Sequence, residues 1–269
     1  MPPVNEELKQ LLSDVQKFLK QEQELHGDAI VLQSREPAMK NAVPQPKAKN
    51  AAADGELFGS VPVPPSAPTP LQEYPQEPWT SATTLDGLNK TICTCTKCSL
   101  GHSRKKFVFG VGNPQSEIVL IGEAPGADED EQGEPFVGRA GQLLNKILEA
   151  IRFKREEVFI CNILKCRPPN NREPAPEEIE LCEPYLWKQL ELIKPKMILC
   201  LGRVAGQALL KTNSSLGNLR GKFHDYRGIK TMVTYHPAAL LRNPNWKRPT
   251  WEDVQLFRKT YDELKGATG

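Results

Sequence analysis

The feature that most constrains this chain is an apolar run that ends abruptly in a glycine-rich and then acidic segment. Residues 118–121, IVLI, have the apolar and β-branched character of a strand that is buried on both faces. GEAPG at 122–126 then breaks the strand, and a polar, acidic stretch leads to a helical pattern from about Ala140. A strand, a long polar loop and a helix in this order are typical of a ligand site at the carboxyl end of a parallel strand.

The same alternation of apolar runs and helical patterns continues along the chain. The predicted strands cover 117–121, 158–163, 197–201 and 231–235, and the predicted helices cover 140–151, 176–193, 205–210 and 251–265. Alternation of this kind favours a parallel sheet with helices on both faces. We therefore expect an α/β domain, built as a three-layer α/β/α sandwich around a central, mostly parallel four-stranded sheet.

The chain before this domain has a different composition. Residues 1–30 carry an amphipathic helical pattern, residues 31–82 form a Pro-rich stretch typical of a disordered linker, and the folded domain is expected to cover 83–269. Residues 1–80 contain 7 basic and 11 acidic residues, whereas the rest of the chain contains 28 and 22. The mildly basic domain is compatible with nucleic acid. The helical segment either folds back on the core or docks a partner protein, and the linker favours docking.

The acidic segment after the first strand does not suit a phosphate ligand. A phosphate cradle uses glycine-rich backbone amides and a lysine, as in GxxxxGK[ST], and that pattern is absent. The carboxylates of Asp128, Glu129 and Asp130 would instead accept hydrogen bonds or orient a water molecule, unless the segment is only a solvated loop. Phe136 belongs either to the core or to a planar ligand's stacking surface, and its position between glycines favours stacking.

Seven cysteines give a second constraint. No secretory signal or membrane-spanning segment is recognisable, so we expect a cytoplasmic chain with reduced thiols, in which clustered cysteines indicate a metal. Cys95 and Cys98 form a CxxC pair, and Cys166 and Cys182 add two thiols at a spacing unlike that of a zinc ribbon. From the spacing alone, zinc and an iron–sulfur cluster have equal weight. The remaining thiols are interpreted as core residues (Cys161, Cys200) or as a competing ligand (Cys93).

Three separated motifs of this chain resemble those of the family 4 uracil-DNA glycosylases, the iron–sulfur branch of their superfamily. They are GEAPGADEDEQGEPFVGRAGQLL at 122–144, NILKCRPPNNREPAPEEIELC at 162–182 and HPAALLRNP at 236–244. Three motifs in order are much more specific than any one alone. The resemblance implies a glycosylase domain that acts on uracil-containing DNA, and a [4Fe–4S] cluster held by Cys95, Cys98, Cys166 and Cys182.

The resemblance also implies the roles of the site residues. It places the base-reading amide at Asn162, which can pair with O4 and N3–H of uracil, and a hydrogen-bond donor to the departing base at His236. It implies that Glu129 orients the water and that Glu123 lies nearer the base, while Ala124 stands where other branches keep a catalytic Asp. The remaining implied contacts are Ala124, Pro125, Gly126 and Phe136 to the substrate, and Leu240, Leu241 and Arg242 to DNA. The two leucines are either a wedge between bases or helix core, and Lys165 is among several basic residues expected on a surrounding basic rim.

The leading hypothesis is a monomeric uracil-DNA glycosylase that flips uracil out of DNA and hydrolyses its N-glycosidic bond, which initiates base excision repair. Residues 1–30 would then bind a replication or repair protein. The first alternative is a cluster-bearing DNA-binding module without catalysis, and the second is a glycosylase for hypoxanthine or xanthine. A covalent-adduct variant of the superfamily is rejected, because RPPNNREPAPEE at 167–178 lacks the histidine that such chemistry needs.

Overall fold

The computed structural model of the protein describes residues 76–266. The predicted helical segment at 1–30 lies outside the described residues, as does most of the predicted linker. Within the described part of the chain, no helix combines the length and the apolar character needed to cross a membrane.

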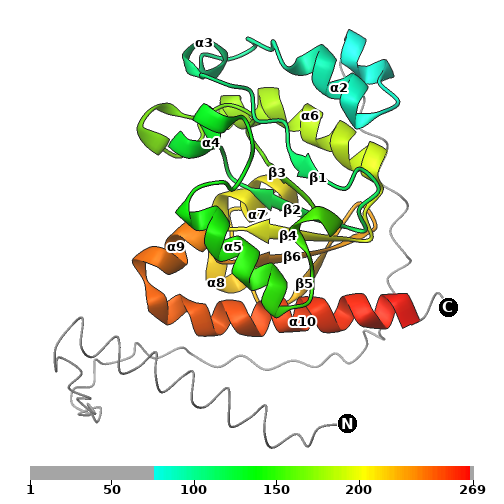
Figure 1. Ribbon diagram of the computed structural model, residues 1–269, viewed down its shortest axis with the longest axis vertical. Helices are drawn as coiled ribbons and strands as arrows, with labels where there is room; N and C mark the ends of the chain where they lie inside the picture. The colour runs from blue at the N-terminus through cyan, green and yellow to red at the C-terminus, as the bar shows by residue number, and fades with distance from the viewer. Residues whose placement is uncertain (1–75, 267–269) are drawn as a thin grey trace, which may run out of the picture. The chain divides into compact units, whose positions relative to one another are not determined.

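A six-stranded mixed sheet forms the middle layer, in the order β1-β3-β2-β4-β6-β5 (Figure 1). The strands are β1 (Val111–Gly112), β2 (Ile118–Gly122), β3 (Phe159–Asn162), β4 (Met197–Leu201), β5 (Phe223–Tyr226) and β6 (Ile229–Thr234). The four central strands, β3, β2, β4 and β6, are parallel to one another, and the edge strands β1 and β5 are antiparallel to them. These central strands are the four that the sequence predicts. The prediction missed the two edges because β1 has only two residues and β5 has a mostly polar sequence.

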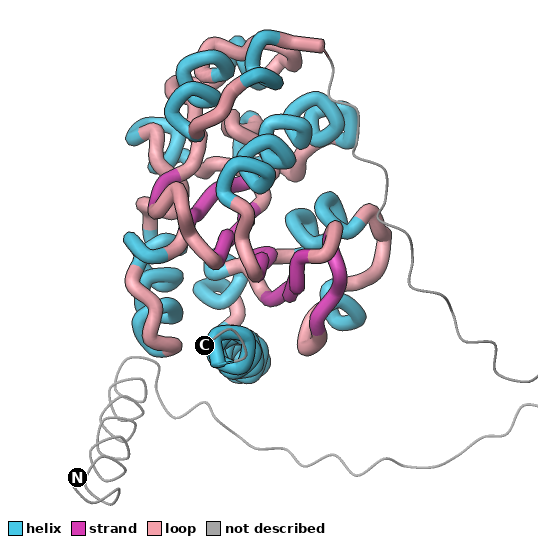
Figure 2. The backbone as a smooth tube through the Cα atoms, turned by 90° about the vertical axis from the view of Figure 1, so that its right-hand side faces the viewer, coloured by secondary structure: helices cyan, strands magenta, loops and turns pink. Residues whose placement is uncertain are grey.

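Helices cover both faces of the sheet, and Figure 2 shows the strands between them. The α-helices are α2 (Leu85–Ile92), α3 (Leu100–Ser103), α4 (Ala127–Gln132), α5 (Arg139–Ala150), α6 (Pro176–Ile193), α7 (Arg203–Leu210), α8 (Leu216–Leu219), α9 (Pro237–Arg242) and α10 (Lys247–Gly266). Short 3-10 turns lie at η1 (Pro78–Ser81), η2 (Arg155–Glu157), η3 (Pro169–Asn171) and η4 (Pro244–Trp246).

Alternate residues of the buried strands point to two separate cores. In β2, Val119 and Ile121 belong to a core shared with α2, α6 and α7, whereas Ile118 and Leu120 belong to a core shared with α5 and α10. This division follows from the period of two along a strand. The predicted three-layer α/β/α arrangement is therefore confirmed.

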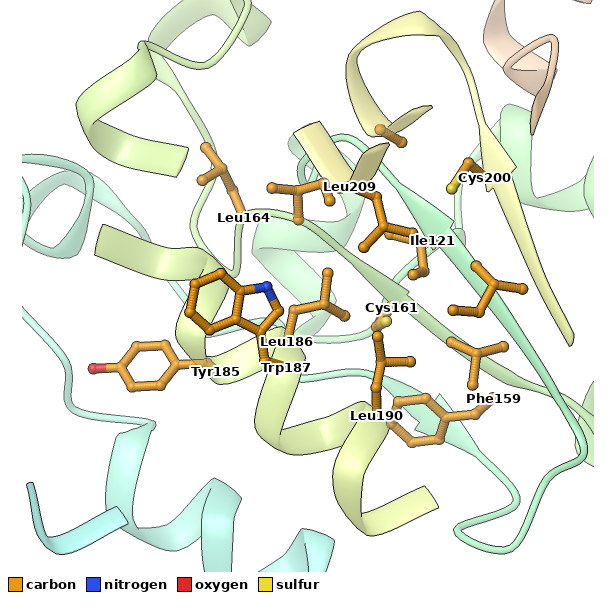
Figure 3. Packing of buried hydrophobic residues seen from close by; sticks show 14 of the residues in the cluster. Ile121, Phe159, Cys161, Leu164, Tyr185, Leu186, Trp187, Leu190, Cys200 and Leu209 are labelled. Carbon is orange, nitrogen blue, oxygen red and sulfur yellow. The ribbon is translucent and has the colours of Figure 1, made fainter. Parts of the chain in front are cut away.

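Helix α6 supplies much of the first core. Its side chains Leu186 and Leu190 lie beside Cys161 of β3, whereas the ring of Tyr185 points away from the strand (Figure 3). Proline at its first position and a cap by the Glu178 carboxylate, which accepts the Ala175 N–H at 2.8 Å, define where the helix begins. The observed bounds are those that the sequence predicts.

The packed structure starts earlier than the predicted domain boundary at residue 83. Trp79, in η1, is only 2 % exposed. Its ring meets that of Tyr185 edge-on, with centroids 5.0 Å apart. The end of the predicted linker therefore packs on α6.

Asp253 fastens α10 to the sheet. Its carboxylate is 1 % exposed and accepts two hydrogen bonds from Arg220, at 3.0 and 2.8 Å, and one from the Thr234 hydroxyl at 2.7 Å. Burial raises the pKa of Asp253, and the bonds from Thr234 and Arg220 oppose that shift. The interaction thus joins the end of β6 to the last helix.

Replacing Asp253 by alanine should lower the free energy of unfolding by about 3–5 kcal/mol, because Arg220 loses its buried partner. Glu252→Ala is the control: this neighbouring carboxylate is exposed, and its loss should change stability by less than about 0.5 kcal/mol. Equilibrium denaturation of both variants measures the difference. Equal stability of the two variants would contradict the assignment.

Candidate active site

A pocket of about 310 Å³ opens at the carboxyl edge of the sheet, where β2, β3 and β6 end. Its walls include all seven predicted substrate contacts, together with two further predicted site residues: Glu123, Ala124, Pro125, Gly126, Phe136, Asn162 and His236, with Glu129 and Arg242. The three sequence motifs are far apart in the chain and meet at this one place.

A glycine at the end of β2 allows two of these side chains to come close. A Cβ at Gly122 would overlap Asn162 Oδ1 and would lie 2.7 Å from the ring atom Cζ of Phe136. Real Cβ atoms do not approach other atoms so closely. The absence of a side chain at Gly122 thus gives Asn162 and Phe136 room to meet at the pocket.

Phe136 belongs to the core and to the pocket at once. It is 6 % exposed and is a member of the core shared with α5 and α10, yet it lines the pocket. Its ring stacks on the imidazole of His236, with centroids 5.4 Å apart and planes at 30°. Its backbone has φ = 54°, which is uncommon for a residue with a large side chain. Both interpretations of Phe136 therefore agree with its position.

Asn162 presents a polar atom without a partner. The residue is 2 % exposed, and its Oδ1 is a buried acceptor that no hydrogen bond satisfies. An unsatisfied buried acceptor costs about 1–3 kcal/mol. A ligand that brings an N–H group to Oδ1 would recover this energy, so the pocket favours such a ligand.

Lys165 does not contribute to a basic rim, and that prediction is wrong. Its side chain is fully buried, and its Nζ donates to the main-chain carbonyl of Asn162 at 2.8 Å and to Gln189 Oε1 at 2.6 Å. Gln189 in turn donates to the carbonyl of Phe109 at 2.9 Å. The apolar surroundings that bury Lys165 are not visible in a short basic motif such as LKCR.

His236 stands at the start of α9 as a neutral donor. Its Nδ1 accepts the backbone N–H of Ala238 at 3.1 Å, so the proton of the neutral ring is on Nε2. Burial, and then the charge of Arg242, lower the pKa of His236 to about 4. The imidazole is therefore uncharged at neutral pH and has one N–H to donate.

The two glutamates of the pocket differ in what holds them. Glu129 accepts backbone N–H groups from Gly126 at 3.0 Å, Val137 at 3.1 Å and Gly138 at 3.3 Å. The bond from Gly126 caps α4, and those from Val137 and Gly138 hold the backbone just before α5. The acidic segment expected as a loop is therefore partly a short helix. Burial raises the pKa of Glu123, and Glu173 adds to the shift. Glu123 is thus the pocket carboxyl that favours protonation.

The predicted DNA-contacting residues of α9 separate into core and surface. Leu240 is 2 % exposed and belongs to the interior, so it does not act as a wedge in this conformation. Leu241 is 42 % exposed, and Arg242 is exposed and lines the pocket. Successive helix positions point in different directions, which explains why only one of the two leucines faces outward.

A second, smaller cavity brings together four cysteines. Cys95, Cys98, Cys166 and Cys182 line it, with Tyr185 at its wall. Arg104, adjacent to this site, donates from Nη1 to Cys166 Sγ at 3.3 Å, and the Tyr185 hydroxyl donates to Cys95 Sγ at 3.2 Å. Burial raises the pKa of Cys182 to about 12, so a thiolate there requires strong positive charge beside it, as a metal provides.

The four thiols share one small cavity, and they are the residues that could together hold a metal group. Within residues 76–266, no three His, Cys, Asp or Glu side chains are arranged to hold a metal ion. Cys93 is not among the residues that line the cavity, and Cys161 and Cys200 are buried in strands as expected.

Comparison with known proteins assigns the family. Residues 109–265 match the family model described as the uracil DNA glycosylase superfamily. A type-4 uracil-DNA glycosylase of Archaeoglobus fulgidus is 47% identical over 190 residues, which cover 68% of this chain and 94% of that protein. The chain belongs to the uracil-DNA glycosylase superfamily. A type-4 uracil-DNA glycosylase of Saccharolobus solfataricus is 46% identical, covering 67% of this chain and 86% of its own length.

Within the superfamily, the relatives also distinguish the branch. A type-5 uracil-DNA glycosylase of Thermus thermophilus is 34% identical, covering 60% of this chain and 80% of its own length. The type-4 relatives are more similar to this chain and share more of it. The predicted resemblance to the type-4 branch of the uracil-DNA glycosylases is therefore confirmed.

The pocket of this superfamily member includes Asn171, a residue of η3 to which the sequence analysis gave no role. Arg172, which was expected on the basic rim, follows it and also lines the pocket. Both Asn170 and Asn171 have positive φ angles, 56° and 54°. An Asn-Asn pair after two prolines is a signal for such a turn, because asparagine tolerates the left-handed region. That signal could have directed attention to Asn171.

The neutral state of His236 can be tested directly. Nuclear magnetic resonance of labelled histidines should show His236 uncharged, with its proton on Nε2, from pH 8 down to about pH 5. In the unfolded chain a histidine takes up its proton near pH 6.5. The unfolded state therefore binds more protons between pH 6.5 and about 4, and the contribution of His236 to stability should fall as the pH falls through that window.

His236→Gln identifies the signal, and the urea-unfolded protein serves as the reference. A folded-state midpoint near pH 6.5 would contradict the lowered pKa of His236, and a proton on Nδ1 of the neutral ring would contradict the tautomer.

Proposed function

We propose that this protein is a uracil-DNA glycosylase that excises uracil from DNA by hydrolysing its N-glycosidic bond. The observation that carries the proposal is the unsatisfied Asn162 Oδ1 in the same pocket as the neutral His236 donor and the Phe136 ring. The named activity of the type-4 relatives supports it.

Base recognition rests on the Asn162 amide. Its Oδ1 accepts from N3–H of uracil, and its Nδ2 donates to O4, so one side chain reads both groups. Cytosine has an amino group at position 4 and no N3–H, so the same amide would face two mismatched groups. Phe136, which lines the pocket, is the proposed stacking surface for the flipped base.

Bond cleavage turns the departing base into an anion and gives the sugar positive character. His236 Nε2–H donates to O2 of uracil, and this bond strengthens as negative charge builds on the oxygen. A neutral imidazole suits this step, because its N–H stabilises the developing uracil anion by a hydrogen bond and the proton stays on the histidine.

Of the two carboxyl groups, Glu123 is the better candidate for the reacting side of the pocket. Glu129 uses both of its oxygens to hold the backbone at Gly126, Val137 and Gly138. We therefore assign Glu129 chiefly to holding the loop, and its predicted role in orienting water passes to Glu123. Leu241 and Arg242 at the mouth of the pocket are the proposed DNA contacts of α9.

The experiment that tests the function is the release of free uracil from a uracil-containing oligonucleotide under single-turnover conditions. Release of free uracil distinguishes a glycosylase from a DNA-binding module without catalysis. Oligonucleotides that contain hypoxanthine or xanthine in place of uracil test the alternative that the enzyme excises one of those bases. Binding without release of any of these bases would overturn the proposal.

Asn162→Asp should lower the single-turnover rate on uracil by about 30- to 1000-fold, which corresponds to about 2–4 kcal/mol. A carboxylate repels O4 of uracil but accepts from the amino group of cytosine, so weak cytosine excision should appear. Asn145→Asp, the same change on the exposed face of α5, is the control and should keep the normal rate. A normal uracil rate in Asn162→Asp would refute this base-reading role.

We also propose that Cys95, Cys98, Cys166 and Cys182 hold a [4Fe–4S] cluster. Their shared cavity and the hydrogen bonds from Arg104 and Tyr185 to two of the sulfurs support this ligand set, and the resemblance of the sequence to the iron–sulfur branch favours the cluster over zinc. When bound, the cluster would cross-link the segment before α3, the loop after β3 and helix α6.

Purified under anaerobic conditions, the protein should contain iron and acid-labile sulfide in equal amounts. Cys182→Ser should lose most of this iron, because one ligand is removed, whereas Cys93→Ser should retain it. Metal analysis and the visible absorption of the brown protein measure both. Stoichiometric zinc without iron, or loss of iron in Cys93→Ser, would contradict the ligand set.

The remaining features of the proposal come from the sequence. The docking of residues 1–30 to a replication or repair protein, the monomeric state and the cytoplasmic location stay predictions.

A further inference from the structure

An aromatic pair lies immediately beside the catalytic pocket and has no role in the chemistry above. Tyr235 precedes His236 in the chain, and its ring stacks on that of Trp246, with centroids 5.1 Å apart and planes at 14°. Trp246 ends η4, the short turn that follows α9. In the chain, Tyr235 and Trp246 therefore flank a segment that contributes His236, Ala238 and Arg242 to the pocket wall.

The indole of Trp246 is open to solvent in a positively charged setting. One of its faces meets Tyr235, and the residue remains 36 % exposed. Residues 236–251 contain Arg242, Lys247 and Arg248 and no acidic residue, and all three basic residues are exposed. An exposed aromatic ring between basic side chains has the character of a single-stranded nucleic-acid site, where bases stack and cations meet phosphates.

Another exposed tryptophan lacks this setting. Trp251 is 41 % exposed and lines a groove between α10 and the end of α5, where Arg258 and Lys259 pair with Asp262 and Glu263 at 2.8 and 3.9 Å. The carboxylates there already engage the cations that a phosphate chain would need. Arg242, near Trp246 in the chain, forms no ion pair within the described residues.

We propose that the Tyr235–Trp246 pair is a stacking platform for an unpaired base of the DNA strand that carries the uracil. This inference rests on the proposed function and adds the substrate class, namely single-stranded or locally opened DNA. In a duplex, each base is already stacked on its neighbours and offers no free face to Trp246. An unpaired base next to the flipped uracil has such a face, and Arg242 lies between the pocket and the platform in the chain.

The first test measures binding of uracil-free DNA by fluorescence anisotropy, with a labelled 12-nucleotide oligothymidine and a matched duplex. Trp246→Ala should weaken single-strand binding by about 5- to 100-fold, since base stacking on an aromatic ring supplies binding of that size. Trp246→Phe should restore most of it. Duplex binding should change by less than about 2-fold, and the control Trp251→Ala should leave both affinities unchanged.

Salt dependence distinguishes stacking from a phosphate contact. Trp246→Ala should leave the slope of log K against log salt unchanged, whereas Arg242→Ala should reduce it. Single-strand binding by Trp246→Ala at the level of the unsubstituted protein would overturn the proposal and leave the ring to another occupant, such as a protein. Equal losses on both DNA forms would also overturn it.

The test is separable from the proposed glycosylase function. Uracil release from an oligonucleotide whose uracil is flanked by abasic sugars, which offers no base to the platform, should be the same in Trp246→Ala and in the unsubstituted protein. A slower release by Trp246→Ala would place Trp246 in the pocket machinery and overturn the platform. If the unsubstituted protein fails to release uracil, the proposed glycosylase activity is wrong. The binding measurements would still show whether the Tyr235–Trp246 pair binds an unpaired base.

Discussion

Both sites depend on one short segment, residues 162–166, which begins at the last residue of β3. Asn162 ends the strand and faces the pocket, and Cys166 lines the cysteine cavity. Between them, the buried Lys165 donates from its side chain to the Asn162 carbonyl and from its backbone to the sulfur of Cys182. Its own carbonyl accepts the N–H of Val108 at 2.9 Å. One short segment therefore fixes the base-reading residue and two of the four proposed cluster ligands.

The charge of Lys165 connects the two sites further. Burial lowers the pKa of the Lys165 ammonium, and the neighbouring thiols of Cys161, Cys182 and Cys166 oppose that shift. In the described part of the chain, no ion pair joins Lys165 to a carboxylate. Thiolate ligation at Cys166 and Cys182, which the proposed cluster requires, would place negative charge beside the ammonium and favour its donating form. The cluster would thus support the pocket electrostatically as well as mechanically.

How much of this could be predicted from the sequence depends on the kind of interaction. The central strands and α6 follow from long apolar or helical patterns, which are strong local signals. The edge strands β1 and β5 are short or polar, and their pairing depends on distant residues. The sequence also identified the residues that line the pocket through the three motifs. It could not show that Lys165 turns inward, because a basic residue in a basic motif resembles a surface residue until its surroundings are known.

The roles of the pocket's ionisable groups follow from their hydrogen bonds, which no motif displays. The sequence alone does not distinguish the roles of Glu129 and Glu123. In the structure, backbone N–H groups donate to the Glu129 carboxylate, whereas burial raises the pKa of Glu123. His236 is held neutral by burial and by Arg242. Because its imidazole is uncharged, His236 interacts only weakly with the base of the intact nucleotide. Its donor gains most as the uracil becomes an anion, and an interaction that strengthens along the reaction is the kind that accelerates it.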